Sequence, residues 1–527
     1  MQFTANSKYY FYKNGCIVLL SAIFLLCVFI RVYRLYEKPM HVDEAVHAVK
    51  FGFLLENNYY KYDPVEYHGP TLNYFTLIPS WLLGKKNIAE VTEAMLRFVP
   101  VFAGLLLLAM LFLLKNFGKE FLIAALILTG FSSLIVFYNR YYIHESLLVS
   151  FSFSGIILGY KFFRNQKTLL LVLSSIFFAL AFASKETFII TVFAITVSHF
   201  VLSMINRNTL NIVPLNSKAV LIFAVTFVIT SLLFFTSFFS NPIGAVDSLL
   251  TFENYFAKAG SNSEHIHPFY YYFTIITFAD IDSIFFSELI IISFFIFGLL
   301  RVFLKANSAV EGIDFIKFIS VLTLVLIIVY SAIPYKTPWT MMSFWQGIIL
   351  VAAFGLAELK KFFSAFYWNL TAVLIAVFLF AQAYFNAVVY SSSPENPFVY
   401  SHAEREIKAV EPLLTEITAV QSEYLSTPIY VAASKSDYWP LPWYLRKFKN
   451  TSWNETITND VYKFPIILAS TDLENVLIKN LYTLPPAGSV NLYVPLFDST
   501  MYIRPGKEIR GYIRKDYLDN YLNSLSK

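Results

Sequence analysis

Long apolar segments constrain this chain more than any other feature of its sequence. Windows of about 20 predominantly apolar residues, the length that crosses the hydrocarbon core of a bilayer, recur along most of the chain. We therefore expect a polytopic α-helical membrane protein with about 11 transmembrane helices. The windows lie at about residues 15–33, 95–114, 120–138, 145–163, 168–184, 187–205, 219–239, 285–304, 315–333, 339–358 and 366–389.

The distribution of charge separates two parts of the chain. Charged residues make up 14% of the sequence, whereas they make up about a quarter of a soluble domain. Residues 1–390 hold 26 Lys/Arg and 20 Asp/Glu, a balance of +6, and residues 391–527 hold 14 and 15, a balance of −1. This predicts a transmembrane module over residues 1–390 and a more polar domain over residues 391–527. A basic excess in membrane loops indicates contact with membrane lipid and excludes a nucleic-acid partner.

Basic residues divide sharply between alternate loops, which predicts the orientation in the membrane. By the positive-inside rule the lysine-rich set of loops is cytoplasmic. We therefore expect a multi-pass protein of the cell membrane, with its N-terminus in the cytoplasm and residues 391–527 on the exported side. The first apolar window should remain as an anchor, because it runs into Arg31 and Arg34 rather than into small residues of a cleavage site. The lysine-rich set comprises Lys8, Lys13, Lys115, Lys119, Lys161, Arg164, Lys167, Arg207, Lys218, Arg301, Lys305, Lys317, Lys360 and Lys361.

The first outer loop, residues 37–94, and the C-terminal domain carry secondary-structure signals of their own. Residues 42–55 and 71–83 are helix-like, and Pro70 precedes the second stretch, so both fit helices lying along the membrane surface. Alternating helix and strand signals predict a small α/β domain at the C-terminus. These signals are a helix-like stretch at 403–420, strand-like runs at 429–433, 466–469 and 491–495, and an aromatic cluster at 438–445.

Acidic and basic residues cluster just after the first apolar window. At helical spacing Asp43, His47 and Lys50 share one face, and Glu44 lies beside His47. A carboxylate next to an imidazole and an ammonium can remove a proton from an acceptor hydroxyl, so we regard Asp43 and Glu44 as candidate catalytic residues and His47 as a substrate-binding candidate. The alternative, which this loop alone favours, is a solvated helix whose charges face water.

Two further outer turns place ionisable residues against the bilayer. Glu145 begins the fourth window, where an acid is costly unless it is paired or hydrated, so it is a third catalytic candidate. Lys185 and Glu186 lie in the turn between the fifth and sixth windows. Lys185 is a candidate ligand of the donor phosphate and Glu186 a candidate substrate-binding residue. The alternative is that the two form an interfacial ion pair. His68, in the first outer loop, is another substrate-binding candidate.

Isolated cations on the outer turns are candidate ligands of a lipid phosphate. Lys336 lies between two prolines beside aromatic residues, and Arg140 lies in the turn before Glu145. The alternative for Lys336 is a snorkelling lysine in an aromatic belt. If these cations do not bind the phosphate, the outer loop at 241–284, with Lys258, His265 and His267, is the next place to look.

No ligand spacing in the sequence is diagnostic of a metal. His41, Asp43 and His47 are the candidate ligands, so a divalent cation remains an open option and no cofactor is required. The two cysteines, Cys16 and Cys27, lie about 16 Å apart along the first helix, beyond disulfide reach.

Several strings of residues, in this order along the whole chain, resemble the GT-C glycosyltransferases, and in particular the protein-O-mannosyltransferase-like superfamily. A narrower resemblance is to a prokaryotic family described as flippase-activity-associated. The strings are His41-Val42-Asp43-Glu44-Ala45, Tyr67-His68-Gly69-Pro70, Arg140-Tyr141-Tyr142, Tyr335-Lys336-Thr337-Pro338-Trp339 and Asp437-Tyr438-Trp439-Pro440-Leu441-Pro442-Trp443-Tyr444-Leu445.

The resemblance implies a GT-C membrane fold and transfer, with inversion, of a sugar from a polyprenyl-phosphate donor to a hydroxyl on the exported face. It implies that Asp43 is the base or acceptor-positioning group, Glu44 its partner and Glu145 the second acid. The acceptor can be a glycolipid, a surface glycan or a protein. The large insert of the protein mannosyltransferases is absent between the later windows, which argues against a protein acceptor.

Two alternatives remain open at the level of sequence. One is a flippase or transporter component without chemistry, although transporters tend to place ionisable residues near the bilayer midplane and to show inverted repeats. The other is an oligosaccharide ligase or polymerase of the same fold, which would move a whole glycan.

Overall fold

The structure is a computed structural model, and it describes residues 5–65, 68–205, 216–259, 265–282, 284–305, 312–499 and 501–526. Tyr67 and Arg207 of the sequence motifs lie outside these residues. The side chains of Lys8, Lys13, Cys16, Lys258 and Lys305 lie outside the described part as well.

The chain folds into two compact units that do not follow a single cut of the sequence. The first comprises Met1–Leu35, Tyr59–Pro79 and Ala94–Tyr400, and the second Tyr36–Asn58, Ser80–Glu93 and Ser401–Lys527. The ends of the first outer loop therefore pack with the C-terminal residues. The predicted division at residue 390 treats the chain as two consecutive pieces, and it stays a prediction.

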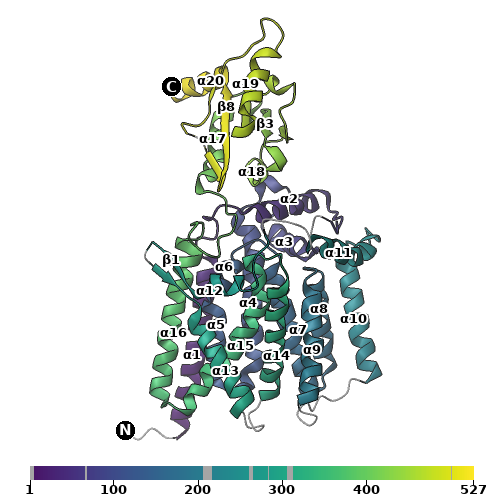
Figure 1. Ribbon diagram of the computed structural model, residues 1–527, viewed down its shortest axis with the longest axis vertical. Coiled ribbons are helices and arrows are strands. Elements are labelled where there is room, and N and C mark those ends of the chain that lie inside the picture. The colour runs from purple at the N-terminus through teal and green to yellow at the C-terminus, as the bar shows by residue number, and fades with distance from the viewer. Residues whose placement is uncertain are drawn as a thin grey trace. The chain divides into compact units, whose positions relative to one another are not determined.

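Long apolar helices form the first unit, side by side in Figure 1. Seven of the described helices are long and apolar enough to cross a membrane, or eight if the bent pair α5–α6 is one span. The remaining three predicted windows coincide with shorter apolar helices. The protein is thus a polytopic helical membrane protein, and the count of 11 spans stays a prediction. The helices are α1 (Ala5–Val32), α4 (Glu93–Leu111), η2 (Phe112–Phe117), α5 (Lys119–Phe131), α6 (Ser133–Asn139), α7 (Glu145–Asn165), α8 (Thr168–Phe182), α9 (Phe188–Ile205), α10 (Ser217–Phe235), α13 (Leu289–Leu300), α14 (Ile313–Ala332), α15 (Met342–Glu358) and α16 (Ala365–Tyr384).

A sharp break divides the predicted span at 120–138. Helix α5 ends at Phe131 and α6 begins at Ser133, with a bend of 56° between them. The fully buried Arg31 of α1 donates from Nη2 to the carbonyl of Thr129 (3.2 Å) and from Nη1 to that of Gly130 (2.8 Å). Its Nε also donates to Oδ1 of Asn139 (3.0 Å). One guanidinium therefore satisfies the carbonyls that α5 leaves free and holds the far end of α6.

Short elements of the first unit occupy the predicted outer loops. Within residues 241–259 and 265–282 the structure has two helices, and a two-stranded antiparallel hairpin pairs Asp280 with Phe285. The elements are α3 (Thr71–Leu82), which extends past Pro79, α11 (Gly244–Ala259), α12 (Tyr271–Thr277), β1 (Ala279–Ile281), β2 (Ile284–Phe286) and η4 (Pro338–Met341).

The second unit combines a mixed sheet with helices, as the sequence predicts for its C-terminal part. The sheet order is β4-β3-β5-β8-β6, with β7 also pairing with β8. Strands β3, β4 and β5 run parallel, and β8 is antiparallel to its neighbours. The strands are β3 (Ile429–Ala432), β4 (Thr451–Asn454), β5 (Ile466–Ser470), β6 (Tyr493–Pro495), β7 (Met501–Arg504) and β8 (Lys507–Arg514), and the principal helices are α2 (Val42–Asn57), α17 (Val410–Ala419), α18 (Leu441–Tyr444), α19 (Glu474–Thr483) and α20 (Lys515–Leu525).

Side-chain hydrogen bonds tie the loop segments into the second unit. The hydroxyl of Tyr444 accepts from the backbone N–H of Met40 (2.9 Å), and Nε1 of Trp443 donates to the carboxylate of Glu93 (2.9 Å). The guanidinium of Arg446 lies 3.9 Å from the Trp443 ring centre and donates to the carbonyl of Val91 (3.0 Å). The aromatic motif around residues 438–445 thus binds the two ends of the first outer loop.

Candidate functional site

The paired acids of the first outer loop lie at the start of α2 and differ in their surroundings. Glu44 is fully buried, and its Oε2 accepts from the backbone N–H of His41 (3.0 Å) while Nδ1 of His41 accepts from the N–H of Asp43 (3.1 Å). This reciprocal arrangement is a capping box, which satisfies N–H groups that the first turn leaves free. The ammonium of Lys38, 3.7 Å away, balances the buried charge of Glu44. Glu44 therefore fixes the start of α2.

Asp43 has a different environment from its neighbour. Its side chain is half-buried, and within the described residues its carboxylate has no hydrogen-bond or ionic partner. His47, one turn later, is also half-buried. The helix thus places Asp43 in its first turn, where the carboxylate is able to accept a hydrogen bond from an acceptor hydroxyl.

Four ionisable side chains gather in the first unit. Glu145 begins α7, where the helix dipole favours a carboxylate, and its oxygen accepts from the ammonium of Lys185. Glu186 follows in the same turn, and its Oε2 lies 2.9 Å from Nδ1 of His68. Glu145, Lys185 and Glu186 are all at least nine-tenths buried, whereas about a third of the His68 side chain is exposed. We call this group the acid–base cluster.

Close backbone packing brings His68 to the turn between α8 and α9. A Cβ on Gly69 would lie 2.1 Å from the carbonyl oxygen of Ala183, so only glycine allows this approach. The N–H of Thr71 donates to that same carbonyl (3.2 Å), and the hydroxyls of Thr71 and Ser184 are hydrogen-bonded at 2.7 Å. The His-Gly-Pro string therefore positions the imidazole against Glu186.

The electrostatics of the cluster favour an ionised Glu186. Burial alone would raise the pKa of its carboxyl group, but His68 and then Lys185 outweigh burial and hold that pKa below the usual value. Burial, and after it the carboxylate of Glu186, raises the pKa of Tyr62 above that of an ordinary tyrosine. Tyr62 is thus a neutral phenol facing a charged acid.

Tyr62 and His144 were missed as site residues by sequence reasoning. The ring of His144 packs edge-to-face on His68, with centroids 5.3 Å apart, and its Nε2 lies 3.1 Å from the carbonyl oxygen of Gly69. Tyr62 is buried against Phe235, with ring centroids 5.0 Å apart. His144 directly precedes Glu145 and could have been inferred from that position, but Tyr62 carries no sequence signal.

Arg140 and Lys336 both bind backbone carbonyls. The Nη1 of Arg140 donates to the carbonyls of Ile30, Arg31 and Tyr33 at 2.8 to 3.0 Å, which caps the C-terminal end of α1. The buried ammonium of Lys336 donates to the carbonyls of His267 (2.9 Å) and Ile333. Burial lowers the pKa of Lys336. Lys336, one of the predicted phosphate ligands, thus has a structural role in its own turn.

Metal ligands do not cluster in the part of the chain that the structure describes. No group of three or more His, Cys, Asp or Glu side chains there has a geometry that could hold an ion. In particular His41, Asp43 and His47 do not form such a group, and His41 is already the cap of α2.

The helices define the class of this protein as a polytopic helical membrane protein, and its fold can be compared with solved structures. No family model and no curated protein matches the sequence. Solved structures match the fold along almost the whole chain at 12–13% identity.

The particular structures come from a bacterium and an archaeon. ArnT from Cupriavidus metallidurans in the apo state matches with a TM-score of 0.62 over 95% of this chain and 98% of its own. The same protein bound to undecaprenyl phosphate matches with a TM-score of 0.59 over 94% and 98%. The oligosaccharyltransferase AglB from Archaeoglobus fulgidus, in complex with an inhibitory peptide and a dolichol-phosphate, matches with a TM-score of 0.54 over 89% and 71%, at 12% identity.

Proposed function

We propose that this protein is an integral-membrane inverting glycosyltransferase that moves a sugar from a polyprenyl-phosphate donor to a hydroxyl acceptor. The observation that carries the proposal is the match to ArnT over nearly the full length of both chains, including its form bound to undecaprenyl phosphate. AglB, bound to a dolichol-phosphate, supports the same class of donor. The narrower relation to the flippase-associated family stays a prediction.

The reaction needs two kinds of group. The acceptor oxygen attacks the anomeric carbon as the bond from that carbon to the phosphate oxygen breaks, and the configuration inverts. The acceptor proton passes to a base, and the lipid phosphate leaves with the bonding electrons. Catalysis thus requires a carboxylate near the hydroxyl and positive charge near the phosphate.

The residue roles follow from the contacts of each side chain. We assign the base to Asp43, because its carboxylate is held at a helix start and is not used by the described protein around it. Glu44 positions this helix through the capping box. The acid–base cluster of Glu145, Lys185, Glu186 and His68 supplies charges for the donor phosphate and its sugar.

Among the three candidate cations, Lys185 is now the first choice for the phosphate. Its partner is a side chain, Glu145, that a phosphate can replace or share. Arg140 and Lys336 instead donate to backbone carbonyls that would lose their partners. His47 and His68 stand beside the two sets of acids as substrate-binding candidates.

The test of the function is transfer in purified protein. Reconstituted full-length protein is incubated with radiolabelled polyprenyl-phosphate sugars and a membrane extract as acceptor, and products are identified by mass spectrometry. Asp43→Asn keeps the shape of the side chain but removes the base, so the rate should drop by roughly 10²-fold or more. Asp498→Asn, an exposed aspartate of the second unit, is the matched control and should leave the rate unchanged.

Two results would contradict the proposal. If Asp43→Asn transfers at the wild-type rate, the base is elsewhere. If the wild-type protein transfers no sugar but moves an intact glycolipid across vesicles, the flippase alternative holds. Transfer of a whole glycan rather than one sugar identifies the oligosaccharide ligase or polymerase alternative.

A further inference from the structure

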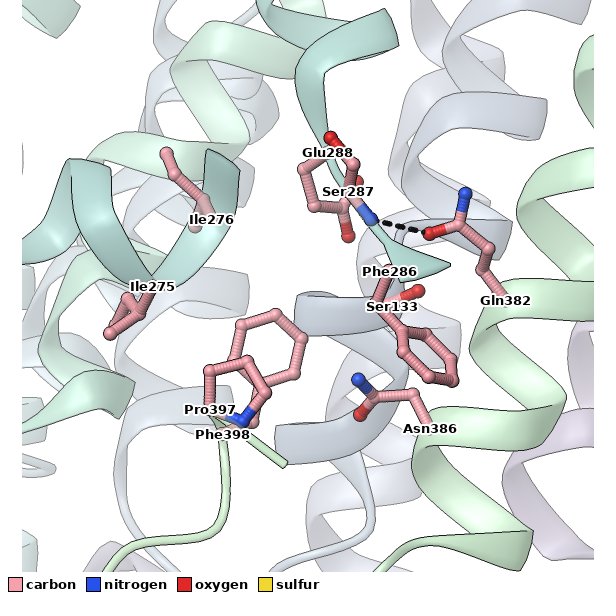
Figure 2. A pocket seen from close by; sticks show the side chains of 10 residues that line it. All are labelled: Ser133, Ile275, Ile276, Phe286, Ser287, Glu288, Gln382, Asn386, Pro397 and Phe398. Atoms are coloured by element: carbon pink, nitrogen blue, oxygen red, sulfur yellow. Dashed lines mark hydrogen bonds between the residues drawn. The ribbon is translucent and has the colours of Figure 1, made fainter. Parts of the chain in front are cut away.

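A small, partly open pocket in the first unit lies apart from the acid–base cluster and has room for about one water molecule or one hydroxyl group. Figure 2 shows its walls: Ser133 comes from α6, Phe286 and Glu288 from the end of the hairpin, Gln382 from α16, and Asn386 from the π-helical turn Phe385–Val389 that continues α16. The remaining walls are mostly apolar. Glu288 is the one charged residue among the residues that line it.

Four buried polar atoms of this lining have no hydrogen-bond partner in the described part of the chain. They are Oε2 of Glu288, Nε2 of Gln382, Nδ2 of Asn386 and Oγ of Ser133. The exposed fraction of these four residues runs from 0% to 7%, so none of the atoms is hydrated at the surface. A buried polar group without a partner costs about 1–3 kcal/mol, so four in one pocket call for a polar ligand.

The orientation of both side-chain amides is fixed by backbone groups. The N–H of Ser287 donates to Oε1 of Gln382 (2.9 Å), which the dashed line of Figure 2 marks, so Nε2 must point the other way. The N–H of Phe398 donates to Oδ1 of Asn396 (3.0 Å), and Nδ2 of Asn396 donates to Oδ1 of Asn386 (3.2 Å). Because a backbone N–H can only donate, both pocket amides present their NH₂ groups as donors.

Glu288 presents an acceptor to the same pocket. Its other oxygen, Oε1, accepts from the hydroxyl of Ser132 and from the backbone N–H of Leu134, both at 3.1 Å. These bonds cap the start of α6 and fix the carboxyl group, which leaves Oε2 for a ligand. Ser133 adds a hydroxyl, which can donate or accept.

The polar groups of the pocket determine the charge of the ligand that it can bind. A carboxylate repels anions, and two amide NH₂ donors repel cations, so neither kind of ion matches the pocket. We propose that the pocket is a binding site for a neutral hydroxyl group, which accepts from Gln382 and Asn386 and donates to Glu288. The hydroxyl belongs either to a sugar residue that lies at the open mouth and inserts one hydroxyl group, or to one ordered water molecule. The sugar source rests on the proposed glycosyltransferase function, whereas the hydroxyl site does not.

Structure determination and a binding measurement test the proposal on the full chain in nanodiscs. A cryo-EM map at about 2 Å, resolving ordered water, is recorded with and without neutral methyl glycosides, and binding of the same glycosides is measured by saturation-transfer difference NMR. We expect density at hydrogen-bond distance from Nε2 of Gln382 or Nδ2 of Asn386. If the ligand is a sugar, Asn386→Leu should weaken glycoside binding by at least about tenfold, the worth of one buried hydrogen bond.

Two further variants keep the result interpretable. Asn369→Leu, the same change at an exposed position of α16, is the control and should bind like the wild type. Glu288→Gln is isosteric and retains an acceptor for the start of α6. It should also weaken glycoside binding, so it serves as the second pocket variant if Asn386→Leu fails to fold.

Each outcome is decisive. Glycoside density that the pocket variants abolish supports the sugar source. Ordered water in the pocket, with no glycoside binding, supports the water source. A dry or closed pocket, or glycoside binding that is unchanged in both pocket variants and has no density here, overturns the proposal. None of these measurements involves sugar transfer, so failure of the proposed reaction would be recognised separately.

Discussion

At the level of single residues, the cations of the first unit illustrate how contacts distinguish residues that look alike in sequence. Arg140, Lys185 and Lys336 are each isolated basic residues on turns that the sequence predicts to lie on the exported side. Arg140 and Lys336 donate hydrogen bonds to backbone carbonyls, whereas Lys185 donates to the carboxylate of a side chain. The sequence shows the position of a charge along the chain but not the partner that the fold supplies.

Lys185→Gln should weaken binding of the donor. Loss of one charge-assisted hydrogen bond to the phosphate corresponds to about 1.5–3 kcal/mol, or roughly 10- to 100-fold in the KM for a polyprenyl-phosphate sugar. Titration of the donor against purified Lys185→Gln and Lys336→Gln measures this. Lys336→Gln should instead lower the unfolding temperature with a smaller change in KM, and equal donor affinity in both variants and the wild type would refute a phosphate role for either lysine.

His68→Gln should raise the pKa of Glu186, because the imidazole is the principal group that holds it down. With the lowered pKa, the stability from the His68–Glu186 pair is present above the unfolded value of about 4.5 and is lost as the pH falls through the folded value. Infrared difference titration of the carboxylate, with Glu186→Gln to assign the band, follows the shift. A band that titrates at the same pH with and without His68 would contradict the pairing.

At the level of elements, the α5–α6 break is the feature that the sequence conceals most completely. Residues 120–138 form one continuous apolar window, and no proline marks the bend at Ser132. The break exists because residues distant in sequence form hydrogen bonds with the backbone groups that it leaves free. Arg31 donates to two carbonyls at the end of α5, and Glu288 accepts from a backbone N–H of α6. Such tertiary partners cannot be inferred from local hydropathy.

Arg31→Leu should destabilise the first unit strongly. The carbonyls of Thr129 and Gly130 and the amide of Asn139 would lose their partner, at about 1–3 kcal/mol for each buried group. Intrinsic fluorescence during heating of the reconstituted protein should show a fall in the unfolding temperature. The control is Arg34→Leu, which changes an exposed side chain one turn later. If both changes lower the unfolding temperature equally, the buried hydrogen bonds of Arg31 are not what stabilises the unit.

The sheet of the second unit shows a different limit of sequence reasoning. Strands β3, β5 and β6 were predicted from their apolar runs and are confirmed. The longest strand, β8, was missed because it contains three basic residues and one acid in eight positions. Its alternate residues Ile509, Gly511 and Ile513 are buried, so the burial pattern has a period of two, but the charged residues between them concealed this pattern in the sequence.

At the level of the whole molecule, the sequence predicted a polytopic α-helical membrane fold, and the structure and its match to a solved membrane-protein fold confirm it. The eleven apolar windows all coincide with helices, because hydropathy over 20 residues depends little on tertiary contacts. The candidate site was predicted less completely. Its charged members were identified, but Tyr62 and the pocket at Glu288 depend on contacts between segments far apart in sequence.

The topology prediction is that the N-terminus is cytoplasmic and residues 391–527 are exported. Reporter fusions after Lys361 and after Ser392 test it, because α16 lies between these positions. We expect a cytoplasmic signal after Lys361 and an exported signal after Ser392. The reverse pair of signals would move every outer turn, and the roles assigned to its residues, to the cytoplasmic face.

The sharing of the first outer loop between the two units has a consequence during synthesis. Residues 36–58 and 80–93 emerge from the ribosome about 300 residues before Ser401, where their remaining partners begin. At about 5–20 residues per second, that interval lasts roughly 15–60 s. Through that time α2 has been made, yet α18, which packs against it, has not. For that interval the nascent chain presents an unfinished apolar face, which a chaperone or the membrane surface would have to shield.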